Sequence, residues 1–115
     1  MADDCVFCKI IQGELPSKKA FENDELVAIH DINAAAPTHI LIIPRQHIAS
    51  LNDATEKDTP LLGHMLQTAI HVAREQKLDA RGYRLVVNTG HEAGQAVAHV
   101  HLHLLGGRYM SWPPG

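Results

Sequence analysis

A chain of 115 residues has room for one compact domain, predicted here to span residues 1–115, and for little else. Its composition, with 45% apolar and 20% charged residues, is that of an ordinary globular protein. The net charge of −3 and the scattered Lys and Arg residues argue against a nucleic-acid partner. No apolar run is long enough to span a membrane, and the N-terminus lacks the pattern of a signal peptide. We therefore expect a cytoplasmic protein with no membrane partner.

The first half of the chain predicts short elements. Asp3 or Asp4 is expected to cap a short helix that ends at Gly13. Alternating or β-branched apolar residues then predict three short strands, the last of them buried and ended by Pro44. These strands are expected at 19–21, 26–30 and 38–43.

The second half contains the clearest helical pattern. Asp58 or Thr59 is expected to cap a helix that ends near Lys77, with Pro60 in its first turn. Its apolar residues are expected to share one face: Leu61, Leu62, Met65, Leu66, Ala69, Ile70 and Ala73. Two more strands are predicted at 83–87 and 97–105, on either side of a glycine-containing loop. Strands around one long helix indicate an α+β domain with a mainly antiparallel sheet.

Three histidines alternate with apolar residues in the last predicted strand. Because side chains alternate across a strand, His99, His101 and His103 are expected to share one face. Positions 99 and 103 lie roughly 13 Å apart along a strand, so at most two of the three can bind one metal ion. At least one histidine is then left for other chemistry. The alternative is a surface strand that carries histidines by chance.

Cys5 and Cys8 are the two cysteines of the chain, in the spacing Cys-x-x-Cys. In a cytoplasmic protein this spacing indicates metal binding or redox chemistry. The pair would supply half of a tetrahedral zinc site, so two further ligands would have to come from distant segments. A redox pair and two buried, idle thiols are the alternatives.

The segment His99-Val-His101-Leu-His103 resembles the signature of the histidine-triad family. The resemblance covers nearly the whole chain and is to the branch of nucleoside-phosphoramidate hydrolases. Further segments that carry it are His30-Asp31-Ile32, Ala36-Pro37-Thr38-His39, Val86-Val87-Asn88, Gly94-Gln95, Leu105-Gly106-Gly107-Arg108 and Trp112-Pro113-Pro114-Gly115. It implies the fold of that family, a mainly antiparallel five-stranded sheet with one long and one short helix.

The resemblance also implies an activity, the hydrolysis of purine nucleoside 5′-phosphoramidates to release AMP or GMP from an amine. His101 would be the nucleophile and form a nucleotidyl-histidine intermediate, while the carbonyl of His99 would fix its tautomer. His103 and His39 would assist at the phosphate; for His39 the alternative is a buried histidine satisfied by backbone. Two other functions remain open: a non-catalytic nucleotide- or protein-binding module that uses the same pocket, and a zinc hydrolase.

Several residues are expected to bind the nucleotide. Asp31 would accept hydrogen bonds from both ribose hydroxyls, or else form an Asx turn before Asn33. By resemblance Asn88 would contact phosphate or ribose, and backbone amides of a glycine-containing loop would surround the phosphate oxygens. The loop residues are Gly94, Gln95 and Ala96, and the slot for the purine is expected from Phe7, Ile29, Ile32 and Leu41, all of which could instead be core residues.

Family members with this cysteine pair complete a zinc site with residues that match His47 and His99. The resemblance thus implies a structural zinc held by Cys5, Cys8, His47 and His99, and no organic cofactor. It also implies a homodimer in which the two sheets run together and the C-terminal tail with Trp112 reaches the partner's site. One position departs from the pattern, because many relatives carry a polar residue, often a serine, where this chain has Ala96.

Overall fold

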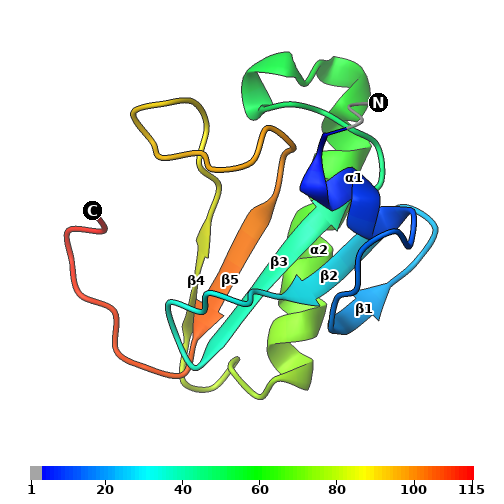
Figure 1. Ribbon diagram of the computed structural model, residues 1–115. Coiled ribbons are helices and arrows are strands. Elements are labelled where there is room, and N and C mark those ends of the chain that lie inside the picture. The colour runs from blue at the N-terminus through cyan, green and yellow to red at the C-terminus, as the bar shows by residue number, and fades with distance from the viewer. Residues whose placement is uncertain (1–3) are drawn as a thin grey trace.

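Five strands form one antiparallel sheet in the computed structural model, which describes residues 4–115 (Figure 1). The strands lie in the order β1-β2-β3-β5-β4, and each neighbouring pair is antiparallel. Their bounds are β1 Lys19–Glu22, β2 Leu26–His30, β3 Thr38–Pro44, β4 Tyr83–Val86 and β5 Leu102–Gly106. The predicted α+β class and the five-stranded antiparallel sheet are confirmed.

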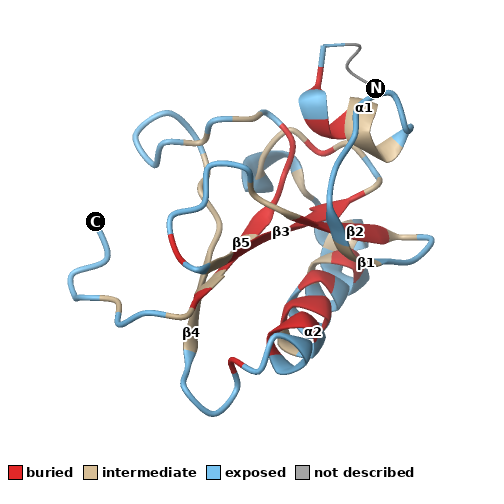
Figure 2. Cartoon of the chain, turned by 60° about the horizontal axis from the view of Figure 1, so that its bottom comes forward, coloured by how far each residue is buried: buried red, intermediate tan, exposed pale blue. Residues whose placement is uncertain are grey.

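Helix α2 (Thr59–Glu75) covers one face of the sheet, after two short 3₁₀ turns, η1 (Leu51–Asp53) and η2 (Glu56–Asp58). Its buried side faces the strands (Figure 2) and comprises Leu61, Met65, Thr68, Ala69, Val72 and Ala73. The prediction was wrong for Leu66, which is 50% exposed, because the face that meets the sheet is centred on Met65, Ala69 and Val72. Asp58 stands at the N-cap, but its side chain accepts from the Thr55 amide in the preceding turn instead of capping α2.

The two faces of the sheet bury different sets of side chains because residues of β2 and β3 alternate between them. On the α2 side lie Leu26, Ala28, Ile40 and Ile42. On the other side Val27, Ile29, Leu41 and Ile43 pack against the short helix α1 (Val6–Ile11). Burial on both faces explains why these strands read as continuous apolar runs.

Helix α1 begins at a cysteine instead of an aspartate. Cys5 is the N-cap, and its Sγ accepts a hydrogen bond from the Cys8 amide at 3.4 Å. The expected caps are therefore wrong for Asp4, which precedes the cap and is exposed, while Asp3 lies outside the described residues. The spacing of the cysteines thus places both sulfur atoms at the first turn of a helix.

The last strand starts later than predicted, at Leu102, so His99 and His101 precede it and His103 alone of the three lies within it. Pro44, the last residue of β3, has no amide to continue the ladder beyond Leu102. The Val100 amide instead donates to the Ile48 carbonyl at 2.7 Å. The alternation nevertheless persists, since Val100, Leu102 and Leu104 join the core on the α2 side.

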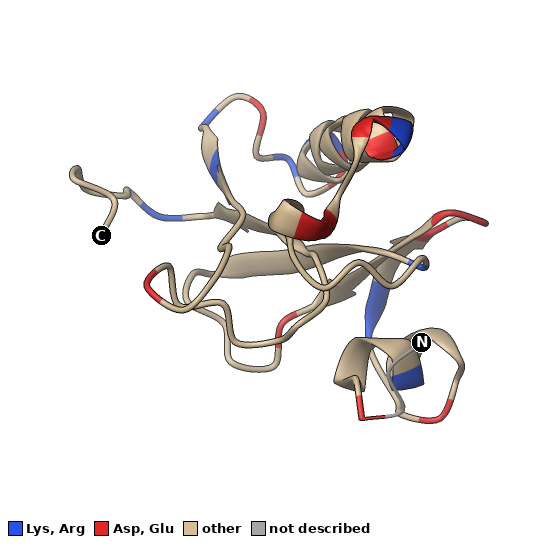
Figure 3. Ribbon diagram, turned by 90° about the horizontal axis from the view of Figure 1, so that it is seen from above, with Lys and Arg blue, Asp and Glu red and all other residues tan. Residues whose placement is uncertain are grey.

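Acidic and basic residues are spread over several elements (Figure 3). Among the described residues no helix is both long and apolar enough to cross a membrane.

Candidate functional site

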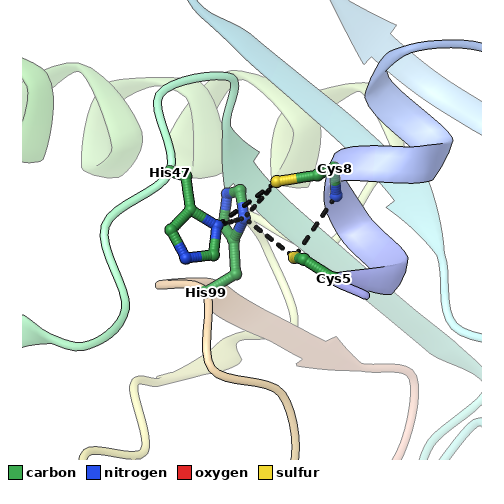
Figure 4. Close-up of side chains that lie close together, drawn as sticks. All are labelled: Cys5, Cys8, His47 and His99. Atoms are coloured by element: carbon green, nitrogen blue, oxygen red, sulfur yellow. Dashed lines mark hydrogen bonds between the residues drawn. The ribbon is translucent and has the colours of Figure 1, made fainter. Parts of the chain in front are cut away.

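Four side chains from three distant segments converge beside α1 (Figure 4): Cys5, Cys8, His47 and His99. Cys8 Sγ lies 3.2 Å from His47 Nδ1 and 3.6 Å from His99 Nδ1, and Cys5 Sγ lies 3.4 Å from His99 Nδ1. The two Nδ1 atoms are 3.1 Å apart. The structure therefore brings together the four residues that were expected to share a zinc ion.

The donor atoms have the arrangement that a tetrahedral zinc ion requires. Around an ion with bonds of about 2.0–2.3 Å, tetrahedral ligands lie roughly 3.3–3.8 Å from one another. The sulfur–nitrogen and nitrogen–nitrogen distances here are 3.1–3.6 Å, and both cysteines and His99 are buried. These four residues fit a metal ion, and as four protein ligands they would leave no open coordination position.

The ring of His99 is oriented for metal binding by a neighbouring carbonyl. Its Nε2 lies 2.8 Å from the Pro44 oxygen, so Nε2 carries the proton and donates it. The lone pair of Nδ1 is then directed at the cysteines. Burial lowers the pKa of His99, against the opposing effect of the Pro44 hydrogen bond, and so keeps the ring in the neutral form that a metal needs.

A cavity of about 320 Å³ opens beside this cluster. It is lined by Asp4, Cys5, Val6, His47, Ala49, Ala96, Val97 and Ala98. Two of the four cluster residues therefore border it, which gives an ion a way in from solvent.

His101 is buried next to this cluster, and its ring has one defined tautomer. Its Nδ1 lies 2.7 Å from the carbonyl oxygen of His99 and must donate a proton to it. The lone pair of Nε2 is therefore free to act as a nucleophile or base. This is the contact that the resemblance implied for the His99 carbonyl.

Phe7 of α1 packs edge-on against both of these histidines, with ring centroids 5.0 Å from His101 and 5.9 Å from His99. Phe7, Ile29 and Leu41 were expected to line a purine slot, but each is 5–6% exposed and belongs to the buried cluster under α1. The role of Phe7 in holding the histidine rings was missed, since its only sequence signal is its place between the two cysteines.

A second cluster lies along β3 and β5, where His39 pairs with His103. His39 Nε2 is 2.9 Å from His103 Nδ1 and 3.4 Å from Asp31 Oδ2. The amide of Ala35 donates to His39 Nδ1 at 3.0 Å, so the proton of the neutral His39 ring resides on Nε2. His39 thus donates to His103, whose own proton is left on Nε2.

These three side chains come close enough to hold a metal ion, but the hydrogen bonds argue against one. A metal bound at His39 Nε2 would require the proton to move to Nδ1. There it would meet the amide proton of Ala35 head-on. We therefore interpret this cluster as a hydrogen-bonding relay.

The pKa of His103 is lowered from 6.5 to about 4. The main cause is burial, and the neighbouring rings of His101 and His39 add to it, whereas Asp31 opposes the shift. Burial also lowers the pKa of His39. Both rings are consequently neutral at pH 7, which is consistent with the hydrogen bonds just described.

This shift predicts a dependence of stability on pH. Between pH 6.5 and about 4 the unfolded chain binds a proton at His103 that the folded chain does not, so the free energy of unfolding should fall as the pH is lowered through this window. In His103→Asn the slope should be smaller. Urea unfolding at several pH values measures it, and His71→Asn, on the exposed side of α2, is the control. Equal slopes in wild type and His103→Asn would contradict the shift.

The structure places Asp31, expected to bind the ribose, and Ile32, expected to line the purine slot, directly after β2. Asp31 Oδ1 accepts a hydrogen bond from the Asn33 amide at 2.8 Å. This contact is the Asx turn that was the alternative to ribose binding by Asp31. Its side chain is 19% exposed and Oδ2 faces His39, so a ligand contact at Oδ2 stays a prediction. Ile32 is 96% exposed, so it is not part of the buried core of the described residues, and its contact with a purine stays a prediction.

The loop between β4 and β5 differs from expectation. The amides of Gly94 and Gln95 donate to the carbonyls of His91 and Gly90, so neither is available to a phosphate in this conformation. The Gln95 side chain donates to the Ala49 and Val97 carbonyls and accepts from the Gly90 amide, a bracing role that sequence reasoning missed.

The remaining phosphate-binding candidates are Ala96 and Asn88. Ala96 is exposed and borders the cavity beside the cysteines. Asn88 is half-buried and follows β4 by two residues. Continuing the register in which Val86 pairs with His103 would set Asn88 opposite His101. Both contacts stay predictions.

Comparison with known proteins identifies close relatives along the whole chain. A family model described as "Scavenger mRNA decapping enzyme C-term binding" matches residues 4–112. An uncharacterized HIT-like protein of Synechococcus elongatus is 48% identical over 115 residues, 100% of each chain. A 14 kDa zinc-binding protein of Zea mays is 46% identical over 112 residues, 96% of this chain and 87% of the maize protein.

Solved structures agree with these relatives. A HIT family hydrolase from Legionella pneumophila is 51% identical, with a TM-score of 0.96 over 97% of this chain and 100% of its own. A HIT family hydrolase from Clostridium thermocellum is 46% identical, with a TM-score of 0.94 over 96% of each chain. In sequence and in fold, the chain therefore belongs to the histidine-triad (HIT) family.

Proposed function

We propose that this protein is a purine nucleoside phosphoramidate hydrolase of the HIT family, with His101 as its nucleophile. The observation that carries the proposal is the hydrogen bond from His101 Nδ1 to the His99 carbonyl, which leaves Nε2 as the reactive atom. The solved relatives described as HIT family hydrolases support hydrolysis as the class of reaction.

In the first step, Nε2 of His101 attacks the α-phosphorus of the substrate. A bond forms between Nε2 and phosphorus while the phosphorus–nitrogen bond to the amine breaks. The amine leaves with the bonding electron pair and takes up a proton from solvent, which the attacking water gives back in the second step. In the second step, water attacks the phosphorus of the nucleotidyl-histidine, releases the nucleoside monophosphate and restores the neutral ring.

His103 and His39 assist as hydrogen-bond donors. The His39 proton on Nε2 is committed to His103 Nδ1, so His103 presents its own N–H at Nε2. That N–H can donate to a phosphate oxygen as charge develops on it. The ring of His103 lies 4.9 Å from that of His101, close enough for both to contact one phosphate group.

Asp31 is proposed to bind the ribose hydroxyls through Oδ2, and Asn88 to contact the phosphate. We further propose that the four-residue cluster of Cys5, Cys8, His47 and His99 holds a structural zinc ion. The zinc-binding maize relative supports this choice of metal. When bound, the zinc would tie α1 to the segment before β5, and the reaction itself would be carried by the histidines.

We also propose that the chain acts as a homodimer in the cytoplasm. The position of β4 at the edge of the sheet and the exposed Tyr109 and Trp112 side chains of the tail support a second copy at that edge. A dimer in light scattering at working concentration is expected, and a monomer would contradict it.

The test of the proposed function is turnover of a fluorogenic adenosine 5′-phosphoramidate. Amine release by the wild type, with formation of AMP, is expected, and a brief acid quench should trap a nucleotidylated protein by mass. Absence of turnover together with retained AMP binding would instead favour a non-catalytic nucleotide-binding module that uses the same pocket.

Ala96 should limit the rate, because it lacks a side-chain donor beside the phosphate. Ala96→Ser is expected to raise kcat on the same substrate, since one donor to a developing oxyanion can be worth about 10²-fold. Position 96 is exposed, so the hydroxyl fits without repacking. Ala98→Ser, also on the rim of the cavity, is the matched control. An unchanged kcat in Ala96→Ser would show that this position is idle.

A further inference from the structure

The loop between β2 and β3 carries the site's carboxylate and leads into its buried histidine. It crosses the face of the sheet opposite α2, and the C-terminal tail leaves β5 beside it (Figure 1). Between Asn33 and Thr38 its residues are three alanines and Pro37, which have no polar side-chain atoms. The position of this loop therefore depends on hydrogen bonds made by its backbone.

Ala35 is the residue at which this loop is held. Its amide donates to His39 Nδ1 at 3.0 Å, and its carbonyl accepts from Arg108 Nε at 3.1 Å. His39 then donates through Nε2 to His103 at 2.9 Å. A continuous chain of contacts thus runs from Arg108 through Ala35 to the two histidines of the relay.

Arg108 is itself fixed by the way the chain leaves β5. A Cβ at Gly106 would lie 2.7 Å from Leu78 Cδ1, so the buried Leu78 side chain would have to shift to admit one. Gly107 has a φ of +94°, and a Cβ on it would lie 2.9 Å from Pro37 Cβ in the same loop. The Arg108 guanidinium also donates through Nη1 to the Tyr109 carbonyl at 3.1 Å. The side chain is thereby directed at the loop.

We propose that Arg108 is a positioning residue for the His39–His103 relay. By fixing the Ala35 backbone, it keeps the Ala35 amide on His39 Nδ1 and so holds the His39 proton on Nε2, where it is donated to His103. Among the described residues Arg108 makes its hydrogen bonds to the Ala35 and Tyr109 carbonyls and none to His39 or His103. The catalytic consequence rests on the proposed function, but the effect on the ring tautomer does not.

The test compares Arg108→Ala with Arg108→Lys and Arg81→Ala. Lysine can restore one charged donor to the Ala35 carbonyl. Arg81 lines the same cavity of about 240 Å³ as Arg108, so Arg81→Ala removes the same charge from that cavity without touching the loop. The readouts are kcat and KM for a fluorogenic adenosine 5′-phosphoramidate, amide hydrogen exchange at Ala35, and the ¹⁵N shifts of the His39 ring.

In Arg108→Ala we expect kcat to fall about 3- to 10-fold, the loss of one hydrogen bond, with little change in KM. The Ala35 amide should exchange faster, and the His39 nitrogen shifts should move toward a mixture of tautomers. Arg108→Lys should recover part of each change, and Arg81→Ala should resemble the wild type.

Wild-type exchange and wild-type His39 shifts in Arg108→Ala would overturn the proposal, as would equal effects in Arg81→Ala. If the wild type shows no turnover, the proposed function is wrong, and the exchange and ring shifts then decide the positioning role by themselves.

Discussion

Replacing His101 with alanine is expected to reduce hydrolysis of an adenosine 5′-phosphoramidate by roughly 10³- to 10⁶-fold, the usual effect of losing a covalent nucleophile. The expectation follows from the geometry of one ring. His101 donates from Nδ1 to the His99 carbonyl, so its Nε2 lone pair is available for attack on phosphorus. Alanine removes that atom, and the nucleotidylated protein should no longer be trapped.

His101→Asn makes the experiment sharper. An asparagine side chain retains an N–H that can donate toward the His99 carbonyl, yet it offers no ring nitrogen to attack phosphorus. A loss in both variants, with AMP binding and melting temperature close to wild type, would assign the loss to chemistry. His71→Ala, on the exposed side of α2, should leave kcat unchanged. Either His101 variant retaining more than a tenth of wild-type kcat would refute His101 as the nucleophile.

The parts of the fold that could be predicted are those determined by local sequence pattern. The strands predicted at 26–30 and 38–43 followed from unbroken apolar runs, and the structure has them at Leu26–His30 and Thr38–Pro44. Helix α2 followed from a repeat of three to four residues. The alternation of His99, His101 and His103 with core residues also held, because its cause is the geometry of an extended chain. The four residues of the predicted zinc site do meet, although their pairing came from the family resemblance and not from spacing.

What could not be predicted depends on partners far away in the sequence. The late start of β5 follows from Pro44, which ends the neighbouring strand without an amide to donate. The bracing role of Gln95 requires the Ala49 carbonyl, and the engagement of the Gly94 amide requires the turn at His91. The link from Arg108 to His39 spans 69 residues and includes only backbone atoms of Ala35, so no motif could reveal it.

Cys8→Ser is expected to abolish zinc binding and to destabilise the protein. The Cys8 sulfur lies within 3.6 Å of both candidate histidine ligands, so its removal takes away one of the four ligands at the centre of the cluster. Metal analysis of protein purified without chelator should find about one zinc per wild-type chain and almost none in the variant. We expect a loss of about 3 kcal/mol or more in stability, a fall of roughly 10 °C in Tm. His47→Ala should behave alike, whereas the exposed His91→Ala should keep its zinc.

Treating the protein with a chelator distinguishes a structural zinc ion from a catalytic one. Four protein ligands would complete the coordination of the zinc, so no position is left for a reactive water. At a temperature well below its Tm, chelator-treated protein should therefore keep most of its kcat while its Tm falls. Loss of kcat in proportion to the zinc removed would favour the zinc hydrolase. If wild-type protein contains no zinc and its Tm equals that of Cys8→Ser, the zinc site is contradicted. The cysteines would then be a redox pair or two buried thiols.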